Sequence, residues 1–125
     1  MRLEAVAEIN ITGTYDYQIR EGTISYRDTI AGICSDVVQD IKPGIVSARF
    51  HNTIIKSLSE VIGKVSEETG INKVVLSGGT FQNNYLVSGL KEKLLPKYKL
   101  YLHKVVPPND GGLALGQLLI GAQKR

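Results

Sequence analysis

The apolar positions in the first part of the chain change from a strand-like alternation to helical spacing. Residues 15–20 (Y-D-Y-Q-I-R) alternate, a Glu-Gly turn follows, and residues 23–26 are expected to return as the second arm of a hairpin. Asp28 then stands where a helix N-cap is expected, because the apolar residues after it share one helical face. These residues are Ile30, Ile33, Cys34, Val37, Val38 and Ile41. We expect Pro43-Gly44 to end this helix.

A longer helix is predicted to follow the Pro-Gly pair. Its apolar stripe repeats about every 3.6 residues and ends at Gly70, a residue typical of helix C-termini. The stripe consists of Phe50, Ile54, Ile55, Leu58, Val61, Ile62 and Val65. His51 lies three and four residues before Ile54 and Ile55, on or beside the stripe. A single histidine on an apolar face makes no metal site, so a hydrogen-bonded core histidine is favoured over a role in a site.

The pattern changes again at Lys73, where strand and helix segments alternate. The predicted elements are a short, fully buried strand at 74–76, a helix carrying Leu86, Val87, Leu90, Leu94 and Leu95 that Pro96 ends, a strand at 98–106, a loop at 107–110 and a helix at 111–122. Two strands and two helices in this order, within about 50 residues, imply parallel strands joined by a right-handed crossover. We therefore expect a single α/β domain over residues 1–125, with the hairpin and helices ahead of a parallel βαβα unit.

Both predicted strand-to-helix loops should emerge at one edge of the sheet, because the carboxyl ends of parallel strands lie together. The first loop is S-G-G-T-F-Q-N-N (77–84), and the second is P-P-N-D-G-G (107–112). Each leads into a helix N-terminus, whose unpaired N–H groups and partial positive charge favour an anion such as a phosphate. The loops contain four glycines that let a ligand approach the main chain closely: Gly78, Gly79, Gly111 and Gly112. A plain tight turn is the alternative for the diglycine.

Two polar residues of these loops have two interpretations each. Asp110 is either a helix N-cap or a ligand to a divalent metal that balances the charge of a bound phosphate. Asn83 either caps its helix through its side chain or donates to a ligand.

Serine nucleophile chemistry is not supported by the spacing. Ser77 stands at a strand-to-helix turn, but L-S-G-G-T is not the G-x-S-x-G of a nucleophile elbow. His103 follows it on a predicted strand, where we expect a half-exposed side chain.

Composition narrows the class of protein. The chain has 125 residues, of which 42% are hydrophobic and 22% charged, as in ordinary globular domains. Its net charge of +3 comes from scattered residues, so we expect no nucleic-acid partner. Cys34 is the single cysteine, which excludes an intrachain disulfide and a multi-cysteine zinc site and favours a reducing compartment such as the cytoplasm. Residues 113–122 are too short and too interrupted for a membrane span, and the acidic start, with Glu4 and Glu8, is unlike a signal peptide.

Four stretches together resemble the C-terminal end of the HypF carbamoyltransferases, which act in the maturation of nickel–iron hydrogenases. They are M-R-L-E-A (1–5), A-R-F-H-N-T (48–53), L-S-G-G-T-F-Q-N-N-Y-L (76–86) and V-P-P-N-D-G-G-L-A-L-G-Q (106–117). The resemblance implies a domain similar to the threonylcarbamoyl-transferases that modify tRNA (TsaD-like). It also implies the second lobe of the two-lobed fold of actin, sugar kinases and Hsp70 chaperones (ASKHA), with the nucleotide between the lobes.

The same resemblance implies a reaction and roles for individual residues. Full-length members convert carbamoyl phosphate and ATP into carbamoyl adenylate, and then pass the carbamoyl group to the C-terminal cysteine of HypE. That thiocarboxamide is later dehydrated to a cyanide ligand of the hydrogenase iron. By motif, the nucleotide would contact Ser77, Gly78, Gly79, Thr80, Asn83, Gly111 and Gly112. Asp110 would bind a divalent metal, which is Mg, Fe or Zn.

Several parts of the family pattern are not found in this sequence. They are the acylphosphatase-like domain, the cysteine-rich zinc fingers, the carbamoyl-adenylate-forming domain and the first lobe with its metal-binding histidine pair. We therefore expect little or no carbamoyl transfer by this chain alone, and uncovered apolar surface that favours a homodimer. The alternative function is a non-catalytic module that docks HypE or a separate first lobe. A sugar or acetate kinase lobe would share the fold but lacks the P-P-N-D-G-G loop.

Overall fold

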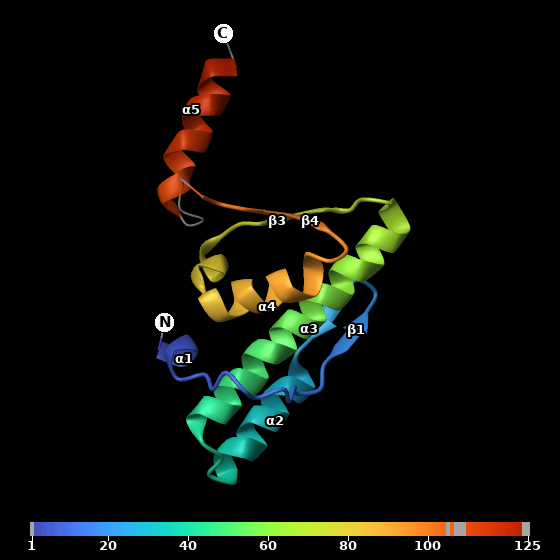
Figure 1. The fold of residues 1–125 in the computed structure, drawn as a ribbon, viewed down its shortest axis with the longest axis vertical. Helices are drawn as coiled ribbons and strands as arrows, with labels where there is room; N and C mark the ends of the chain where they lie inside the picture. The colour runs from blue at the N-terminus through green and yellow to red at the C-terminus, as the bar shows by residue number, and fades with distance from the viewer. Residues whose placement is uncertain (1, 105, 107–109, 124–125) are drawn as a thin grey trace.

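The computed structural model describes residues 2–104, 106 and 110–123, and it has a mixed α/β fold (Figure 1). The elements are α1 (Arg2–Ala5), β1 (Gln18–Arg20), β2 (Thr23–Ser25), α2 (Arg27–Val38), α3 (Pro43–Thr69), β3 (Lys73–Leu76), the 3-10 helix η1 (Gly79–Gln82), α4 (Asn84–Leu94), β4 (Lys99–Leu102), the 3-10 helix η2 (Asp110–Gly112) and α5 (Leu113–Gln123). The mixed α/β class predicted from the sequence is confirmed.

The long helix α3 is the axis of the fold, and both α2 and α4 pack against it (Figure 1). It ends at Gly70 as predicted: Gly70 has a left-handed φ of 71° and its N–H bonds to the Ser66 carbonyl. The prediction for Pro43 is wrong, because Pro43 begins this helix and does not end the previous one. A proline suits the first helical turn, where its missing N–H would have no intrahelical partner.

The predicted hairpin is present, and it leads directly into α2. Strands β1 and β2 pair antiparallel with Arg20 opposite Thr23, and the turn residues Glu21 and Gly22 both have positive φ. The predicted N-cap at Asp28 is wrong, because α2 begins at Arg27 and its N-cap is Tyr26, two residues earlier. Asp28 instead lies in the first turn, a favourable place for an acid, and accepts a 2.8 Å hydrogen bond from the Gln18 side chain.

Strands β3 and β4 are parallel neighbours, with Leu76 opposite Leu102. Their inner face packs on α4 and the middle of α3. The buried residues of this core are Ile55, Leu76, Leu86, Leu90, Leu94 and Tyr98. Because the register is in step, the carboxyl ends of the two strands lie side by side.

The other face of this strand pair is open, so the prediction of a fully buried strand is wrong. Val75 is 67% exposed and Tyr101 is 49% exposed. Alternate residues of a strand point to opposite faces, and α4 covers only one of them in the described part of the chain. Strand β4 is also shorter than the predicted 98–106, because it ends at Leu102.

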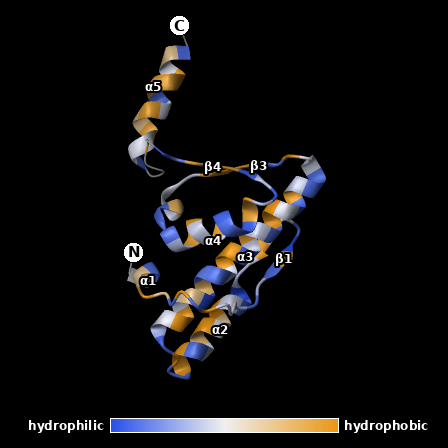
Figure 2. Cartoon of the chain, in the orientation of Figure 1, coloured by the Kyte–Doolittle hydropathy of each residue, from blue (hydrophilic) through white to orange (hydrophobic). Residues whose placement is uncertain are grey.

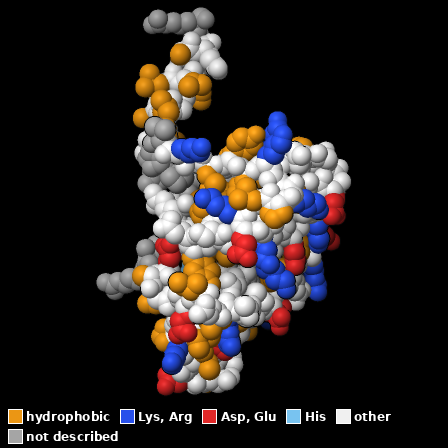
Figure 3. Space-filling model, viewed as in Figure 1, with side chains coloured by type: hydrophobic (Ala, Val, Ile, Leu, Met, Phe, Trp, Pro, Cys, Tyr) orange, Lys and Arg blue, Asp and Glu red, His pale blue; other side chains and the backbone are white. Residues whose placement is uncertain are grey.

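Helix α5 extends away from the rest of the molecule and is exposed along its whole length (Figure 1). Much of its ribbon is orange, for hydrophobic, in Figure 2, and orange side chains lie along it in the space-filling view of Figure 3. The large ones, Leu113, Leu115, Leu118, Leu119 and Ile120, are each at least 50% exposed. Among the described residues, no helix combines the length and apolar character that crossing a membrane requires.

Candidate functional site

The residues that directly follow β3 and β4 lie side by side, at the edge where the two loops were predicted to emerge. Ser77 directly follows β3, His103 directly follows β4, and the Ser77 hydroxyl and His103 Nε2 are 2.8 Å apart. The prediction that His103 lies on a strand is wrong. Strand β3 ends at Leu76, so β4 has no partner beyond Leu102, and His103 turns out exposed beside the first loop.

The diglycine that follows Ser77 presents open main chain. Gly78 has φ 100° and ψ 163°, a combination that only glycine adopts without strain. A Cβ atom added at either Gly78 or Gly79 would meet no atom of the described residues within 4 Å, apart from its chain neighbours. The N–H groups of Gly79 and Thr80 open η1, where they have no partner inside the helix. A ligand can therefore reach this backbone directly, as the sequence analysis predicted.

The Asn83 side chain caps α4, so the first of its two interpretations is confirmed. Its Oδ1 accepts a 3.0 Å hydrogen bond from the Leu86 N–H, and its Nδ2 lies 2.9 Å from His51 Nε2. The residue is only 4% exposed. Both ends of the amide are thus used within the chain, and a contact between Asn83 and the nucleotide stays a prediction.

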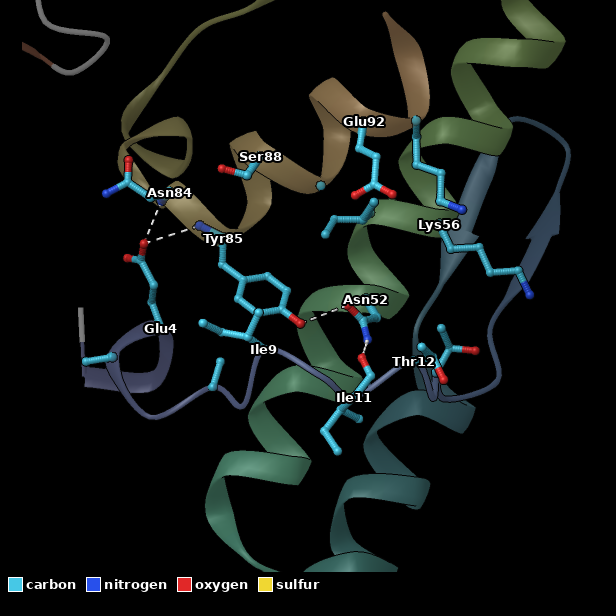
Figure 4. Close-up of a pocket in the computed structure, with 16 residues that line it drawn as sticks. Glu4, Ile9, Ile11, Thr12, Asn52, Lys56, Asn84, Tyr85, Ser88 and Glu92 are labelled. Atoms are coloured by element: carbon cyan, nitrogen blue, oxygen red, sulfur yellow. Dashed lines mark hydrogen bonds between the residues drawn. The ribbon is translucent and has the colours of Figure 1, made fainter. Parts of the chain in front are cut away.

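The first turn of α4 is also occupied by Glu4, a residue that the sequence analysis did not assign to the site. Glu4 Oε1 accepts from the N–H of Asn84 at 2.6 Å and lies 3.4 Å from the N–H of Tyr85 (Figure 4). The prediction that the bare N–H groups of this helix hold an anion is therefore wrong, because the chain supplies its own carboxylate. The only sequence signal for Glu4 was its place in the M-R-L-E-A stretch.

His51 is a buried, hydrogen-bonded histidine as predicted, with 2% of its surface exposed. Its Nδ1 lies 2.8 Å from the Ser47 carbonyl, and its ring packs against Tyr85 with centroids 5.1 Å apart. Through Asn83 it also contacts the start of α4. The core interpretation of His51 is therefore confirmed, and a role in a ligand site stays a prediction.

The second loop is described from Asp110 onward; its residues Pro107, Pro108 and Asn109 lie outside the described residues. Asp110 is exposed in η2, followed by Gly111 and Gly112, and in Figure 1 this turn lies at the same end of the strand pair as η1. An exposed carboxylate fits one position around a hard divalent cation. Within residues 2–104, 106 and 110–123, no three His, Cys, Asp or Glu side chains are grouped to hold a metal, so further ligands must come from a phosphate or another part of the protein.

A cavity of about 1030 Å³ adjoins the start of α4 (Figure 4). Its walls are the N-terminal segment between residues 4 and 14, the middle of α3 and one side of α4. Asn52 connects two walls: its side chain accepts from the Tyr85 hydroxyl and donates to the Ile11 carbonyl at 2.7 Å. Burial raises the pKa of Tyr85. The N-terminal segment shows no helical or strand periodicity, which is why the sequence analysis did not find this cavity.

A charged cluster between α2 and α3 fixes the end of the N-terminal segment. Asp36 accepts hydrogen bonds from the Tyr15 hydroxyl at 2.6 Å and from Arg49 at 2.7 Å. The Tyr15 hydrogen bond, assisted by Arg49, lowers the pKa of Asp36. Burial, together with the Asp36 carboxylate, raises the pKa of Tyr15 to about 12. The cluster positions Tyr15 and the segment before it on α2 and α3.

The model of one protein family matches residues 1–117, almost the whole chain, and its description is "Carbamoyltransferase, Kae1-like Domain, second subdomain". The chain belongs to the HypF carbamoyltransferase family. The HypF of Synechocystis is 30% identical over 129 residues, which cover 98% of this chain and 16% of that protein. HypF2 of Cupriavidus necator is 35% identical over 79 residues, or 62% of this chain and 10% of that protein.

Solved HypF structures have the same fold. The crystal structure of full-length HypF in its phosphate- and nucleotide-bound form matches 97% of this chain with a TM-score of 0.88 and 38% identity. HypF of T. kodakarensis matches 99% with a TM-score of 0.81 and 17% identity, which speaks for the fold alone. This chain covers 16% of each of those proteins, so it spans about a sixth of their length.

Proposed function

We propose that this chain is the nucleotide-binding second lobe of a HypF carbamoyltransferase, with the actin, sugar-kinase and Hsp70 architecture. The observation that carries the proposal is the open diglycine backbone at the carboxyl edge of the β3–β4 pair, beside the Ser77–His103 contact. Ligands of parallel α/β sheets bind at this carboxyl edge. The HypF that matches 97% of this chain was solved in a phosphate- and nucleotide-bound form, which supports the same class of ligand here.

In this proposal the two loops hold the phosphates of ATP or carbamoyl adenylate. The main-chain N–H groups of Gly79 and Thr80 donate to phosphate oxygens, and the absence of side chains at Gly78 and Gly79 lets the nucleotide approach. Ser77, Gly111 and Gly112 lie at the same edge and contribute further contacts.

Asp110 binds the divalent cation that accompanies those phosphates. A bound cation would neutralise phosphate charge and polarise the reacting group. The chain's own contribution is a single carboxylate, exposed and next to two glycines. The remaining ligands would be phosphate oxygens and residues of the other lobe.

The carbamoyl transfer itself belongs to the whole protein. We propose that a complete HypF containing this lobe transfers the carbamoyl group to the C-terminal cysteine of HypE, in the cytoplasm and during hydrogenase maturation. Because a cleft between two lobes needs both walls, the isolated chain should bind nucleotide weakly and transfer little or no carbamoyl group.

Calorimetric titration of the chain with ATP and Mg²⁺ tests the proposal. In Gly79→Ala the new methyl would meet no described atom within 4 Å beyond its chain neighbours, so we attribute a loss of affinity to contact with the ligand. We expect binding to weaken by about tenfold or more in this variant and in Asp110→Ala, roughly the effect of one lost close contact or charge-assisted bond. Gly63→Ala, within α3, is the matched control that leaves affinity unchanged. Wild-type affinity in both site variants would refute the nucleotide site.

A non-catalytic docking module is the second candidate, and the exposed apolar surface of α5 favours it. Leu118 is 71% exposed and Ile120 61%, which is unusual for large apolar residues on one helix. This surface suits the first lobe or HypE. Absence of ATP binding, together with saturable binding of either protein, would favour this candidate.

A further inference from the structure

We propose that His51 is a positioning residue for the nucleotide loop: as the neutral tautomer with its proton on Nδ1, it fixes the orientation of the Asn83 amide and thereby the start of α4. The importance for nucleotide binding rests on the function proposed above. The hydrogen-bond arrangement does not, and it can be tested separately.

The partners of the imidazole ring determine its tautomer. Nδ1 lies 2.8 Å from the main-chain carbonyl of Ser47, and a carbonyl can only accept, so Nδ1 carries the proton. In a neutral ring Nε2 is then an acceptor, and the Asn83 amide 2.9 Å away must offer its NH₂ group. This orientation leaves Asn83 Oδ1 for the Leu86 N–H, at 3.0 Å. Each donor therefore faces an acceptor.

Reversing the Asn83 amide would break two contacts at once. Its NH₂ group would then face the Leu86 N–H, donor against donor, and its oxygen would face the Nε2 lone pair. His51, Ser47 and Asn83 are at most 4% exposed, so water cannot replace the lost partners. The ring thus selects the only amide orientation that also caps α4.

Further hydrogen bonds of these residues and their neighbours connect three stretches that are far apart in the sequence. The Ser47 hydroxyl donates to the Leu3 carbonyl, which lies next to Glu4, and Glu4 accepts from the N–H of Asn84. Asn83, between η1 and α4, is the point where these contacts meet the loop that begins with the diglycine. A defined Asn83 orientation therefore holds η1, and with it the N–H groups proposed to bind phosphate, against the body of the fold.

Two amide substitutions at His51 separate its two hydrogen bonds. In His51→Gln the side-chain carbonyl reaches the position of Nε2, so it still accepts from Asn83 and loses only the bond to Ser47. In His51→Asn the shorter amide reaches the position of Nδ1, so it keeps the bond to Ser47 and leaves Asn83 without an acceptor. Both variants remove the ring and lose its packing against Tyr85, so each controls for this loss in the other.

Nitrogen-15 NMR of the wild-type chain provides the first readout. The chain has only two histidines, and the spectrum of His51→Gln identifies the signal of the other one. We expect Nδ1 of His51 to be protonated and Nε2 to show the shift of an unprotonated acceptor. A proton on Nε2, in either the other tautomer or the cation, would overturn the proposal.

Amide hydrogen exchange at Leu86 and ATP affinity provide the second readout. We expect His51→Asn to speed exchange of the Leu86 N–H and weaken ATP binding, each by about tenfold, as one lost hydrogen bond implies. His51→Gln should keep both values within about twofold of wild type. Equal effects in the two variants would overturn the proposal and leave only a packing role. If the wild type binds no ATP, the proposed function fails, and Leu86 exchange alone decides this inference.

Discussion

Replacing Gly78 by alanine tests the idea that the first loop holds an unusual backbone conformation for its ligand. Gly78 has φ 100° and ψ 163°, a region that costs a residue with a Cβ atom about 1–3 kcal/mol. A new Cβ would meet no described residue within 4 Å beyond its chain neighbours, so we expect the cost to arise from the backbone conformation and not from a clash. Alanine also restricts the unfolded chain, which offsets about 0.4–1 kcal/mol. We expect a net loss of about 1–2 kcal/mol of unfolding free energy.

Gly79→Ala is the matched control, because Gly79 has the same open surroundings as Gly78 but no positive φ. We expect its unfolding free energy to stay within about 0.5 kcal/mol of wild type or to rise slightly. Urea titrations followed by circular dichroism, with and without ATP, measure both variants. Gly78→Ala should lose stability without ligand, whereas Gly79→Ala should lose only the stabilisation that ATP adds. Equal stability changes in the two variants would refute the backbone argument.

Two further predictions concern the framework around the site. Gly44→Ala would place a Cβ 2.7 Å from the main-chain oxygen of Val6, so we expect a loss of about 1–3 kcal/mol in unfolding free energy. In the control Gly63→Ala the nearest described atom is 3.8 Å away, so the unfolding free energy should rise by about 0.5–1 kcal/mol. Similar melting temperatures for the two variants would contradict this packing. The folded state raises the pKa of Tyr15 from 10.0 to about 12, so it binds that proton more tightly than the unfolded chain does. The stability that this pKa difference contributes is complete below pH 10 and is lost as the pH rises toward 12. The midpoint of urea unfolding should therefore fall less steeply with pH in Tyr15→Phe than in the wild type. Equal pH slopes in the two proteins would count against the contact with Asp36.

Local signals in the sequence were reliable where one residue decides the local conformation. Gly70 ends α3 because only a residue without a Cβ adopts its left-handed φ cheaply, and the Glu-Gly pair makes the hairpin turn for a similar reason. Pro43 was misread because a proline is compatible with both the end of one helix and the start of the next. Only the positions of α2 and α3 distinguish these two cases.

The site required contacts that periodicity cannot show. Glu4 is 80 residues from the N–H group of Asn84 that it occupies, and Ser77 is 26 residues from His103. The ligands, partner and domain organisation inferred from the motifs remain predictions, while the family and the mixed α/β class are established.

The sequence by itself determined the hairpin, the longer helices, the order of the two later strands and the family, because turn residues, apolar spacing and short motifs act over a few neighbouring positions. The tertiary structure decided which hydrogen-bonding groups are still available. It satisfied the first N–H groups of α4 with Glu4 and Asn83 and left the backbone at Gly79 open. The physical reason is that a buried polar group must find a partner, and that partner is selected by packing in space and not by distance along the chain.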